Sequence, residues 1–373
     1  MVNTSVALLR KLVAFDTTSR NSNLALIEWV ADFLNSRGAR VELVYNASKD
    51  KANLLGSIGP HREGGVVLSG HTDVVPVDGQ AWTRDPFALV ELDGRFFGRG
   101  TSDMKGFIAC SLAAVEHWKD VRFQRPVHFA FSYDEEIGCI GAHSLVDLIA
   151  RSIPKPAFAI IGEPTDMRVG VAHNGVTASH TAFRGVAAHA GEPSRGVNAI
   201  GAAADFVRYL REVARLQEIV DSGCTLNVGV IAGGSATNIV AERCSVRWEC
   251  RADKKHDAAV IQNKIFDYID SETLAELDVT NDVEVDVPPF HSGLGDESMQ
   301  LLRSCGAKLP AIRLPFGSEA GIFERSHIPS VVCGPGSIGQ AHRPDEWIAR
   351  TALDEADAFL SRVGTWARQN VPG

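Results

Sequence analysis

The residues best suited to chemistry are histidines and carboxylates that follow short apolar runs. They occur in five segments that are far apart in the chain: Ser-Gly-His71-Thr-Asp73, Gly-Arg-Gly-Thr-Ser-Asp103, Asp134-Glu135-Glu136, Gly-Glu163-Pro-Thr and Ala-His342-Arg-Pro-Asp-Glu. Imidazole and carboxylate without thiolate are the ligands typical of zinc, or a similar divalent ion, in a catalytic site. One such ion needs about three protein ligands, so five candidate segments suit two ions.

The spacing within the segments indicates different roles for neighbouring residues. Asp73 stands two residues after His71, on the same side of an extended segment, and can orient the imidazole ring. Glu135 and Glu136 are adjacent, so their side chains diverge, and one can bind metal while the other faces the substrate. A free carboxylate beside a metal-bound water is a natural general base.

Each segment taken alone also has an ordinary structural explanation. Asp73 can form a turn, and adjacent acids such as Glu135 and Glu136 usually lie in a solvated loop. Glu163 before a proline can cap a turn, and His342 can be a surface histidine. The five segments together favour the metal site.

These segments require a scaffold whose strands end at one place. Continuous apolar runs predict strands that are buried on both faces, as in an α/β sheet. The runs are Val66–Leu68, Val127–Phe131, Ala157–Ile161 and Ser330–Cys333, with a helical stretch at Phe107–Trp118. We therefore expect an open, largely parallel α/β domain. Ligands of such sheets bind beyond the carboxyl ends of the strands, which is where the five segments would converge.

The pattern changes near residue 176 and returns near residue 289. The intervening stretch predicts a strand at Val176–Phe183, a helix at Val197–Leu216, strands at Thr225–Ile231 and Ser245–Arg251, a helix at Asp257–Ile269 and a strand at Val283–Val287. The order β-α-β-β-α-β is that of a ferredoxin-like α+β unit. We expect a catalytic domain formed by residues 1–175 and 289–373, with residues 176–288 inserted as a lid and dimerisation domain.

Composition limits the classes of function. A length of 373 residues suggests two domains, and 45% hydrophobic with 22% charged residues is typical of a globular protein. The net charge of −9 without a basic block argues against nucleic acid as a partner, and no apolar run of about 20 residues predicts a membrane span. Seven scattered cysteines without a CxxC pair, and no signal-peptide pattern, favour a cytoplasmic location.

Longer motifs give the chain a family resemblance. They are SGHTDVVP, GRGTSDMKG, DEEIGCIGA, GEPT, AAHAGEPSRGVNAI, TNIV and PFGSEAGIF. Together they resemble a family of di-zinc amide hydrolases that includes acetylornithine deacetylases, succinyl-diaminopimelate desuccinylases, aminoacylases and related carboxypeptidases. The ending CGPGSIGQAHRPDEW is most similar to the acetylornithine deacetylase branch.

The resemblance implies a role for each matching residue. His71 would bind one metal ion and His342 the other, Asp103 would bridge them, and Glu136 and Glu163 would complete the two ligand sets. The ions would be Zn²⁺, with Co²⁺ as an alternative. Glu135 would be the general base and Asp73 would support the site. The resemblance also implies a homodimer, in which His189 would reach the partner subunit's active site and stabilise the oxyanion.

The implied substrate contacts are Asn238, Arg251, Gly317 and Ser318, of which Arg251 would bind a carboxylate. Each has a plainer alternative: Asn238 can be a turn residue, Arg251 can pair with Asp253 or another surface acid, and His189 can be structural.

The resemblance implies hydrolysis of a small N-acyl amino acid. The expected reaction converts N-acetyl-L-ornithine into L-ornithine and acetate, a step of arginine biosynthesis. A related N-acyl-amino-acid deacylase, a dipeptidase or a succinyl-diaminopimelate desuccinylase is the alternative within the family. His173 and Asn174 stand where desuccinylases carry an arginine, which disfavours that branch. A non-catalytic binding module is the alternative from another class, although such proteins tend to lose the base and Glu135 is present.

Overall fold

The computed structural model describes residues 4–118, 122–271 and 274–369. The chain divides into two units. The first comprises Met1–Ala172, His291–Leu314 and Ser318–Gly373, and the second comprises His173–Phe290 and Pro315–Gly317. The boundaries expected from sequence were 175/176 and 288/289. The short segment Pro315–Gly317, which joins the second unit from far downstream, has no counterpart in the sequence pattern.

Four buried strands form the centre of the larger sheet. They are β6 (Val127–Ser132), β3 (Val66–His71), β7 (Phe158–Pro164) and β15 (Ser330–Gly334), adjacent in that order and parallel to one another. Almost every residue of these strands is buried, as their uninterrupted apolar sequences predict. The expected α/β fold class is confirmed. Because parallel strands end at the same edge, this centre also brings their carboxyl ends together.

The edges of this sheet are partly antiparallel, so among the described residues it is a mixed sheet of nine strands. One edge consists of β1 (Arg40–Tyr45) and β2 (Ala52–Ile58), and the other of β8 (Arg168–His173), β13 (Phe290–His291) and β14 (Lys308–Arg313). A small separate sheet contains β4 (Val90–Leu92), β5 (Arg95–Phe97) and β16 (Trp347–Ala349). The sequence analysis identified none of these edge strands, which are short or only half-buried except for β2.

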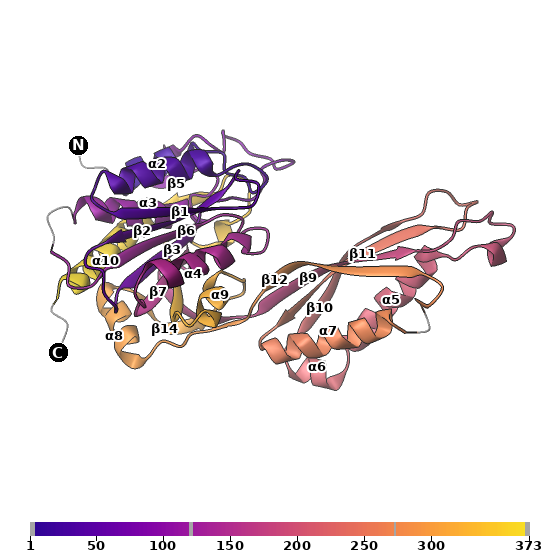
Figure 1. Ribbon diagram of the computed structural model, residues 1–373. Coiled ribbons are helices and arrows are strands. Elements are labelled where there is room, and N and C mark those ends of the chain that lie inside the picture. Colours follow the sequence, from indigo (N-terminus) through magenta and orange to yellow (C-terminus); the bar gives the residue numbers. More distant parts are fainter. Residues whose placement is uncertain (1–3, 119–121, 272–273, 370–373) are drawn as a thin grey trace. The chain divides into compact units, whose positions relative to one another are not determined.

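Helices cover the large sheet (Figure 1). One hydrophobic core is shared by α1 (Ser5–Val13), α2 (Leu24–Asn35), α3 (Lys105–Glu116) and α10 (Arg350–Arg368). On the other side of the sheet, α4 (Ile140–Ser152) and α9 (Ala320–Arg325) pack against the strands. Helix α8 (Asp296–Cys305) packs beside α10, and the short helix η3 (Ile338–Gln340) precedes β16. Helix α3 is buried from Lys105 to Val115, which fits its place between the sheet and other helices. Among the described residues, no helix combines the length and apolarity that a membrane crossing requires.

The second unit has the β-α-β-β-α-β order that the sequence predicts. Its elements are β9 (Gly175–Arg184), η1 (Pro193–Arg195), α5 (Ala199–Val213), α6 (Gln217–Asp221), β10 (Thr225–Gly233), β11 (Arg243–Ala252), α7 (Lys255–Ile269) and β12 (Asp278–Val287). The four strands form an antiparallel sheet in the order β10-β11-β9-β12. Alternate residues of β9 are buried, because α5 and α7 cover one face of this sheet. The helix expected at Val197–Leu216 ends earlier and is followed by the separate α6.

Candidate metal centre

The carboxyl ends of three adjacent parallel strands supply four of the candidate ligands and bases. His71 is the last residue of β3, Glu163 is the penultimate residue of β7, and Glu135 and Glu136 follow β6 within four residues. Asp103 differs from the expectation, because it follows no strand of the large sheet. It lies in the loop between β5 of the small sheet and α3.

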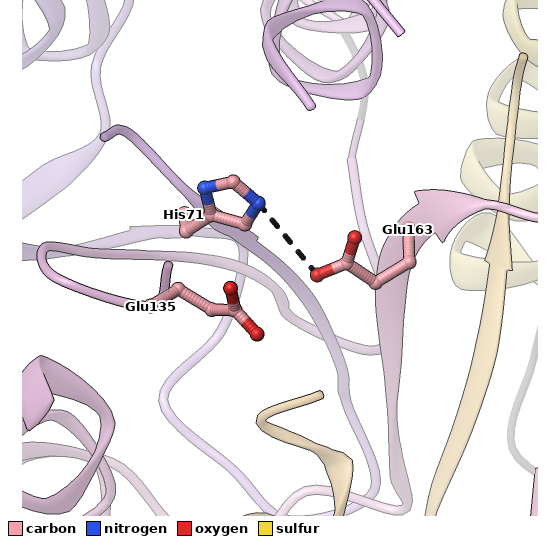
Figure 2. A group of neighbouring side chains, drawn as sticks. All are labelled: His71, Glu135 and Glu163. Atoms are coloured by element: carbon pink, nitrogen blue, oxygen red, sulfur yellow. Dashed lines mark ion pairs between the residues drawn. The ribbon is translucent and has the colours of Figure 1, made fainter. Parts of the chain in front are cut away.

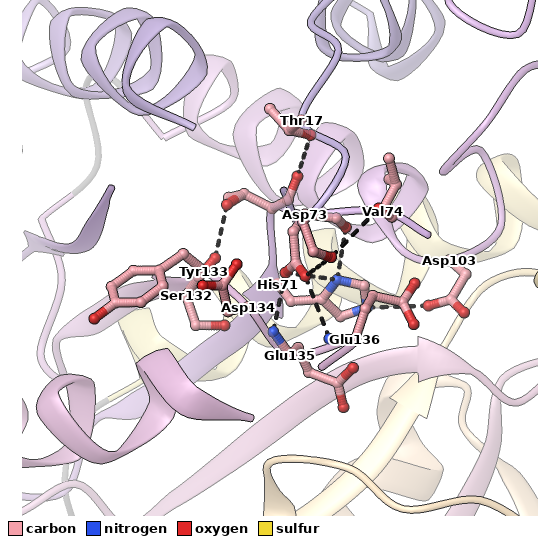
Figure 3. Close-up of polar contacts among 12 residues, drawn as sticks. Thr17, His71, Asp73, Val74, Asp103, Ser132, Tyr133, Asp134, Glu135 and Glu136 are labelled. Carbon is pink, nitrogen blue, oxygen red and sulfur yellow. Dashed lines mark hydrogen bonds and ion pairs between the residues drawn. The ribbon is translucent and has the colours of Figure 1, made fainter. Parts of the chain in front are cut away.

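The structure brings these side chains together around His71 (Figures 2 and 3). Its Nε2 atom lies 3.0 Å from Asp103 Oδ1 and 3.8 Å from Glu163 Oε1. His342, in the loop between η3 and β16, lies with Nε2 2.9 Å from Glu136 Oε2 and 3.5 Å from Asp103 Oδ2. Asp103 therefore faces both histidines, one through each carboxylate oxygen.

Two overlapping groups of potential ligand atoms occur among the described residues. One contains His71, Glu135 and Glu163, and the other contains His71, Asp103 and Glu136. Within each group the ligand atoms lie within 4.8 Å of one another. The geometry thus places Glu135 among potential ligands, whereas the sequence analysis assigns it the role of base.

Asp73 organises the backbone of the two adjacent glutamates (Figure 3). Its Oδ1 atom accepts a hydrogen bond from the Glu135 backbone N–H at 3.1 Å, and its Oδ2 atom accepts one from the Glu136 N–H at 3.3 Å. Ser19 Oγ donates to the same Oδ2 at 2.7 Å. The imidazole of His71 also contacts this residue, with Nδ1 2.9 Å from the Asp73 carbonyl oxygen and 3.6 Å from Oδ1.

The two histidines favour the protonated form in the absence of a cation. Burial lowers the pKa of His71, but Asp103 and Asp73 outweigh burial, and the pKa is raised well above its ordinary value. Hydrogen bonds to Asp103 and Glu136 raise the pKa of His342 to about 10. In both cases a proton supplies the positive charge that the surrounding carboxylates attract.

The carboxyl groups of the cluster outnumber the two histidines, so their negative charges are only partly neutralised. Burial raises the pKa of Glu135 and of Glu163 well above the ordinary value, and it raises the pKa of Glu136 to about 7. The negative charge of Asp103 adds to the increase in all three. So many buried acids with raised pKa values and two histidines are typical of a functional site.

The donor set fits divalent cations. Glu163 is 3% exposed, and its Oε1 atom is buried without a hydrogen-bond partner although it points toward His71. An unpartnered buried carboxylate oxygen is costly, and a cation would satisfy it. Imidazole and carboxylate donors from five segments match what zinc-type ions bind.

Two residues near the site were not identified from sequence. Glu319 stands just before α9, 1% exposed, where its Oε2 atom accepts a hydrogen bond from Ser69 Oγ at 3.1 Å. Cys139 donates a weak hydrogen bond from Sγ to Glu135 Oε1 at 3.4 Å. The position of Glu319 within the apolar stretch PFGSEAGIF is the signal that could have singled it out.

Three of the remaining candidate residues lie in the long stretch of the second unit, residues 173–290. His189 and Asn238 are exposed neighbours there: a bridge pairs His189 with Ile239, and the Ala190 N–H donates to the Asn238 carbonyl at 3.0 Å. Arg251 is the penultimate residue of β11 and pairs with Glu249, Nε to Oε1 at 3.0 Å.

The last two candidates fall on either side of a unit boundary. Gly317 belongs to the second unit, where a methyl group at its Cα would lie in ordinary contact with Val287 and Val176. Ser318 belongs to the first unit, is fully buried and accepts a hydrogen bond from the Ala320 N–H at 3.3 Å.

Comparison with known proteins gives consistent matches over the chain. The model of peptidase family M20/M25/M40 matches residues 67–364. An acetylornithine deacetylase of Pasteurella multocida (strain Pm70) is 32% identical over 368 residues, covering 92% of this chain and 91% of that protein.

Solved structures share the fold at lower identity. A tripeptidase from Staphylococcus aureus subsp. aureus Mu50 matches with a TM-score of 0.79 and 22% identity, covering 99% of both chains. A dinuclear metal-binding peptidase of the M20 family from Bacillus subtilis matches with a TM-score of 0.70 and 15% identity, covering 98% of both chains. The family match spans most of the chain and contains every histidine and carboxylate of the cluster described above. The protein therefore belongs to peptidase family M20/M25/M40 and is a metal-dependent hydrolase of amide bonds.

Proposed function

We propose that the protein hydrolyses N-acetyl-L-ornithine to L-ornithine and acetate, using two divalent ions. One observation supports the choice of substrate: a relative that is 32% identical over nearly the full length of both chains is an acetylornithine deacetylase. Zn²⁺ is the proposed metal and Co²⁺ the alternative, because imidazole and carboxylate accept several first-row ions.

Each ion has a proposed ligand set within the cluster. His71 and Glu163 would hold one ion, His342 and Glu136 the other, and Asp103 would bridge them, since it lies 3.0 Å from one imidazole and 3.5 Å from the other. Bound divalent ions polarise an amide carbonyl and lower the pKa of water, which is the chemistry this reaction needs.

Glu135 is the proposed proton carrier. Asp73 fixes its backbone, Cys139 contacts its Oε1 atom, and burial raises its pKa, which strengthens the carboxylate as a proton acceptor. Glu135 would take a proton from the attacking water and later give it to the leaving amine. His189 is proposed to stabilise the oxyanion. Asn238, Arg251, Gly317 and Ser318 are proposed to contact the substrate.

The test is a comparison of substrates with one enzyme preparation. Purified protein loaded with Zn²⁺ or Co²⁺ is assayed for kcat/KM on N-acetyl-L-ornithine, N-succinyl-diaminopimelate, other N-acyl amino acids and a panel of dipeptides. We expect the highest kcat/KM for N-acetyl-L-ornithine. Little turnover of this substrate beside rapid turnover of another would assign the protein to a different branch, and no turnover of any would favour a binding module.

We also propose a homodimer formed through the second unit. Strands β10 and β12 are the edges of its sheet among the described residues, and Val230 and Ile231 on β10 are half exposed. Exposed edge strands with apolar side chains are surfaces that pair with other chains. Light scattering should give twice the mass of one chain, and a fully active monomer would contradict the dimer. All seven cysteines are buried, which supports a proposed location in the reducing cytoplasm.

A further inference from the structure

A buried carboxylate behind the metal centre binds the loop that carries Asp103. Glu346 is 1% exposed, and each of its two carboxylate oxygens accepts two hydrogen bonds. Oε2 accepts from Arg99 Nη1 at 2.8 Å and from the Gly100 N–H at 2.9 Å. Oε1 accepts from the Ser102 N–H at 2.8 Å and from the Asp103 N–H at 3.1 Å. Four donors fill the acceptor capacity of a carboxylate, so this side chain fixes the loop backbone up to Asp103 itself.

The partner of Glu346 reaches the segment that carries the other ligand. Arg99 is also 1% exposed, and its Nη2 atom donates to Gln80 Oε1 at 2.6 Å. Gln80 Nε2 in turn donates to the carbonyl oxygen of His342 at 3.1 Å. Arg99 Nη1 also lies 3.3 Å from the carbonyl oxygen of Arg343. The backbone of His342 is thereby tied to the same buried ion pair that fixes Asp103.

His342 depends on such backbone support more than the buried ligands do. Its side chain is 56% exposed, whereas that of Asp103 is 7% exposed. Its φ of 63° lies in the left-handed region, which few residues other than glycine adopt. Packing therefore does not hold this imidazole, and the hydrogen bond from Gln80 to its carbonyl acts directly on the residue whose conformation is unusual.

We propose that Glu346, Arg99 and Gln80 form a positioning clamp that sets Asp103 and His342 at the separation required to share a divalent ion. The proposal rests on the metal-binding roles proposed above for those two residues. The clamp residues are not among the proposed ligands and act through the backbones of Asp103 and His342. The clamp mainly affects the ion bound at His342, because His71 and Glu163 at the ends of β3 and β7 have support of their own.

The main test is the E346Q variant. An amide nitrogen in place of one carboxylate oxygen would face backbone N–H donors, which breaks hydrogen bonds on one side of the clamp. We expect the more weakly held ion to bind about 10- to 100-fold less tightly, the range measured for partners behind metal ligands. Titration with Zn²⁺ against a chromophoric chelator gives both affinities. The visible spectrum of the Co²⁺ form reports a changed geometry without any substrate.

A second variant and a matched control separate positioning from stability. Gln80 is only half-buried, so Q80A should fold, and it removes the contact with His342 while leaving the ion pair in place. The control is E116Q, which removes the charge from another, partly buried glutamate–arginine pair, with Arg37, at the last residue of α3. The 12 residues of this helix span about 18 Å, which takes the control far from Asp103. We expect E116Q to lower the unfolding temperature but to keep both metal affinities.

Each result has a definite meaning. Selective weakening of one ion in E346Q and Q80A, with a normal E116Q, supports the clamp. Folded E346Q and Q80A proteins with both affinities and the Co²⁺ spectrum unchanged would overturn it. If E346Q does not fold, unchanged metal binding by Q80A overturns the clamp on its own. Wild-type protein that binds no divalent ion would instead overturn the metal centre, and with it every role assigned here to Glu346.

Discussion

Glu135 and Glu136 are neighbours in the chain, yet the fold gives their side chains different partners. Glu136 pairs with His342 at 2.9 Å, whereas Glu135 has a contact with the Cys139 thiol. Both backbone N–H groups donate to Asp73, so one carboxylate fixes the point at which the two side chains diverge. The adjacency visible in the sequence therefore produces one carboxyl group that pairs with a histidine and one whose Oε1 atom faces a thiol.

The roles of base and ligand make different predictions for the E135Q variant. An amide cannot take a proton from water, so a base role predicts a loss of at least about 100-fold in kcat with the metal content unchanged. A ligand role, which the grouping of Glu135 with His71 and Glu163 allows, predicts a loss of metal instead. Metal content by elemental analysis and kcat, measured on one preparation, distinguish them. Unchanged turnover would remove Glu135 from the mechanism, and E116Q again serves as the control, for a partly buried glutamate outside the cluster.

At the scale of elements, the close approach of α3 to β7 positions two of the ligands. Gly162 precedes Glu163 on β7, and a methyl group on its Cα would lie 2.0 Å from the ring of Phe107 on α3. Phe107 follows Asp103 by four residues and is buried in the core. Only glycine allows the helix to lie this close to the strand, so this contact sets the distance between the elements that carry Asp103 and Glu163.

The G162A variant should therefore be destabilised by overpacking. Inserting a methyl group into a packed core costs about 1 to 3 kcal/mol, and the very short approach to Phe107 places this site at the upper end. Urea unfolding of metal-free protein gives the change in the free energy of unfolding. In the double variant G162A/F107L, a smaller side chain makes room, so its loss should be less than the sum of the two single losses.

A matched substitution in the same unit controls for the added side chain. Gly295 precedes α8, and a side chain there meets nothing within 4 Å. Serine is favoured at this helix-capping position, so G295S should leave the free energy of unfolding unchanged or raise it. A G162A protein as stable as wild type, or losses that are strictly additive in the double variant, would show that the contact with Phe107 is not tight.

The predictability of these elements from sequence follows their burial. The central strands, such as β3 and β7, are uninterrupted apolar runs, so sequence alone locates them and the ligands at their ends. Strands β4, β5 and β16 have three residues each, which is too short to show an alternation of apolar and polar residues. Asp103 lies in the loop after one of these short strands, β5, and not after a strand of the large sheet as expected, although its side chain contacts His71 and His342.

The supporting residues behind the ligands were harder to predict, for a physical reason. Glu346 and Arg99 look like ordinary surface charges in the sequence, and their role depends on a contact between distant loops. Nothing local to either residue specifies that contact. By contrast, His71 and Glu163 each follow a recognisable strand, and the local pattern already indicates where their side chains gather.

At the scale of the whole molecule, the first unit draws its cluster from both ends of the chain. His71 comes from the first quarter of the sequence and His342 from the last tenth, so the cluster forms only when these parts have folded together. The ligands must also lose their protons before an ion can bind, which couples metal affinity to pH and to folding. The protein with metal and the protein without it should therefore respond to pH differently.

In metal-free protein, His342 makes stability fall as the pH rises. Its pKa is raised to about 10 in the folded state, against about 6.5 in an unfolded chain. Its stabilising effect is therefore complete below about pH 6.5 and is lost as the pH rises toward 10. Lys105 acts in the opposite direction in metal-free protein, because burial lowers its pKa to about 7. The difference in stability between metal-bound and metal-free protein at each pH therefore reports on the protons that the ligands lose.

We expect the stabilisation by Zn²⁺ to grow between about pH 7 and 9, because the bound ion replaces a proton that His342 holds less and less firmly. Unfolding temperatures at a fixed free Zn²⁺ concentration and in chelator, measured at several pH values, give this difference directly. A difference that stays constant or narrows would contradict the assignment of His342 as a ligand. In metal-free H342N protein the residue that loses its proton is absent, so raising the pH over this range should cost less stability than in metal-free wild type, with Lys105 acting equally in both.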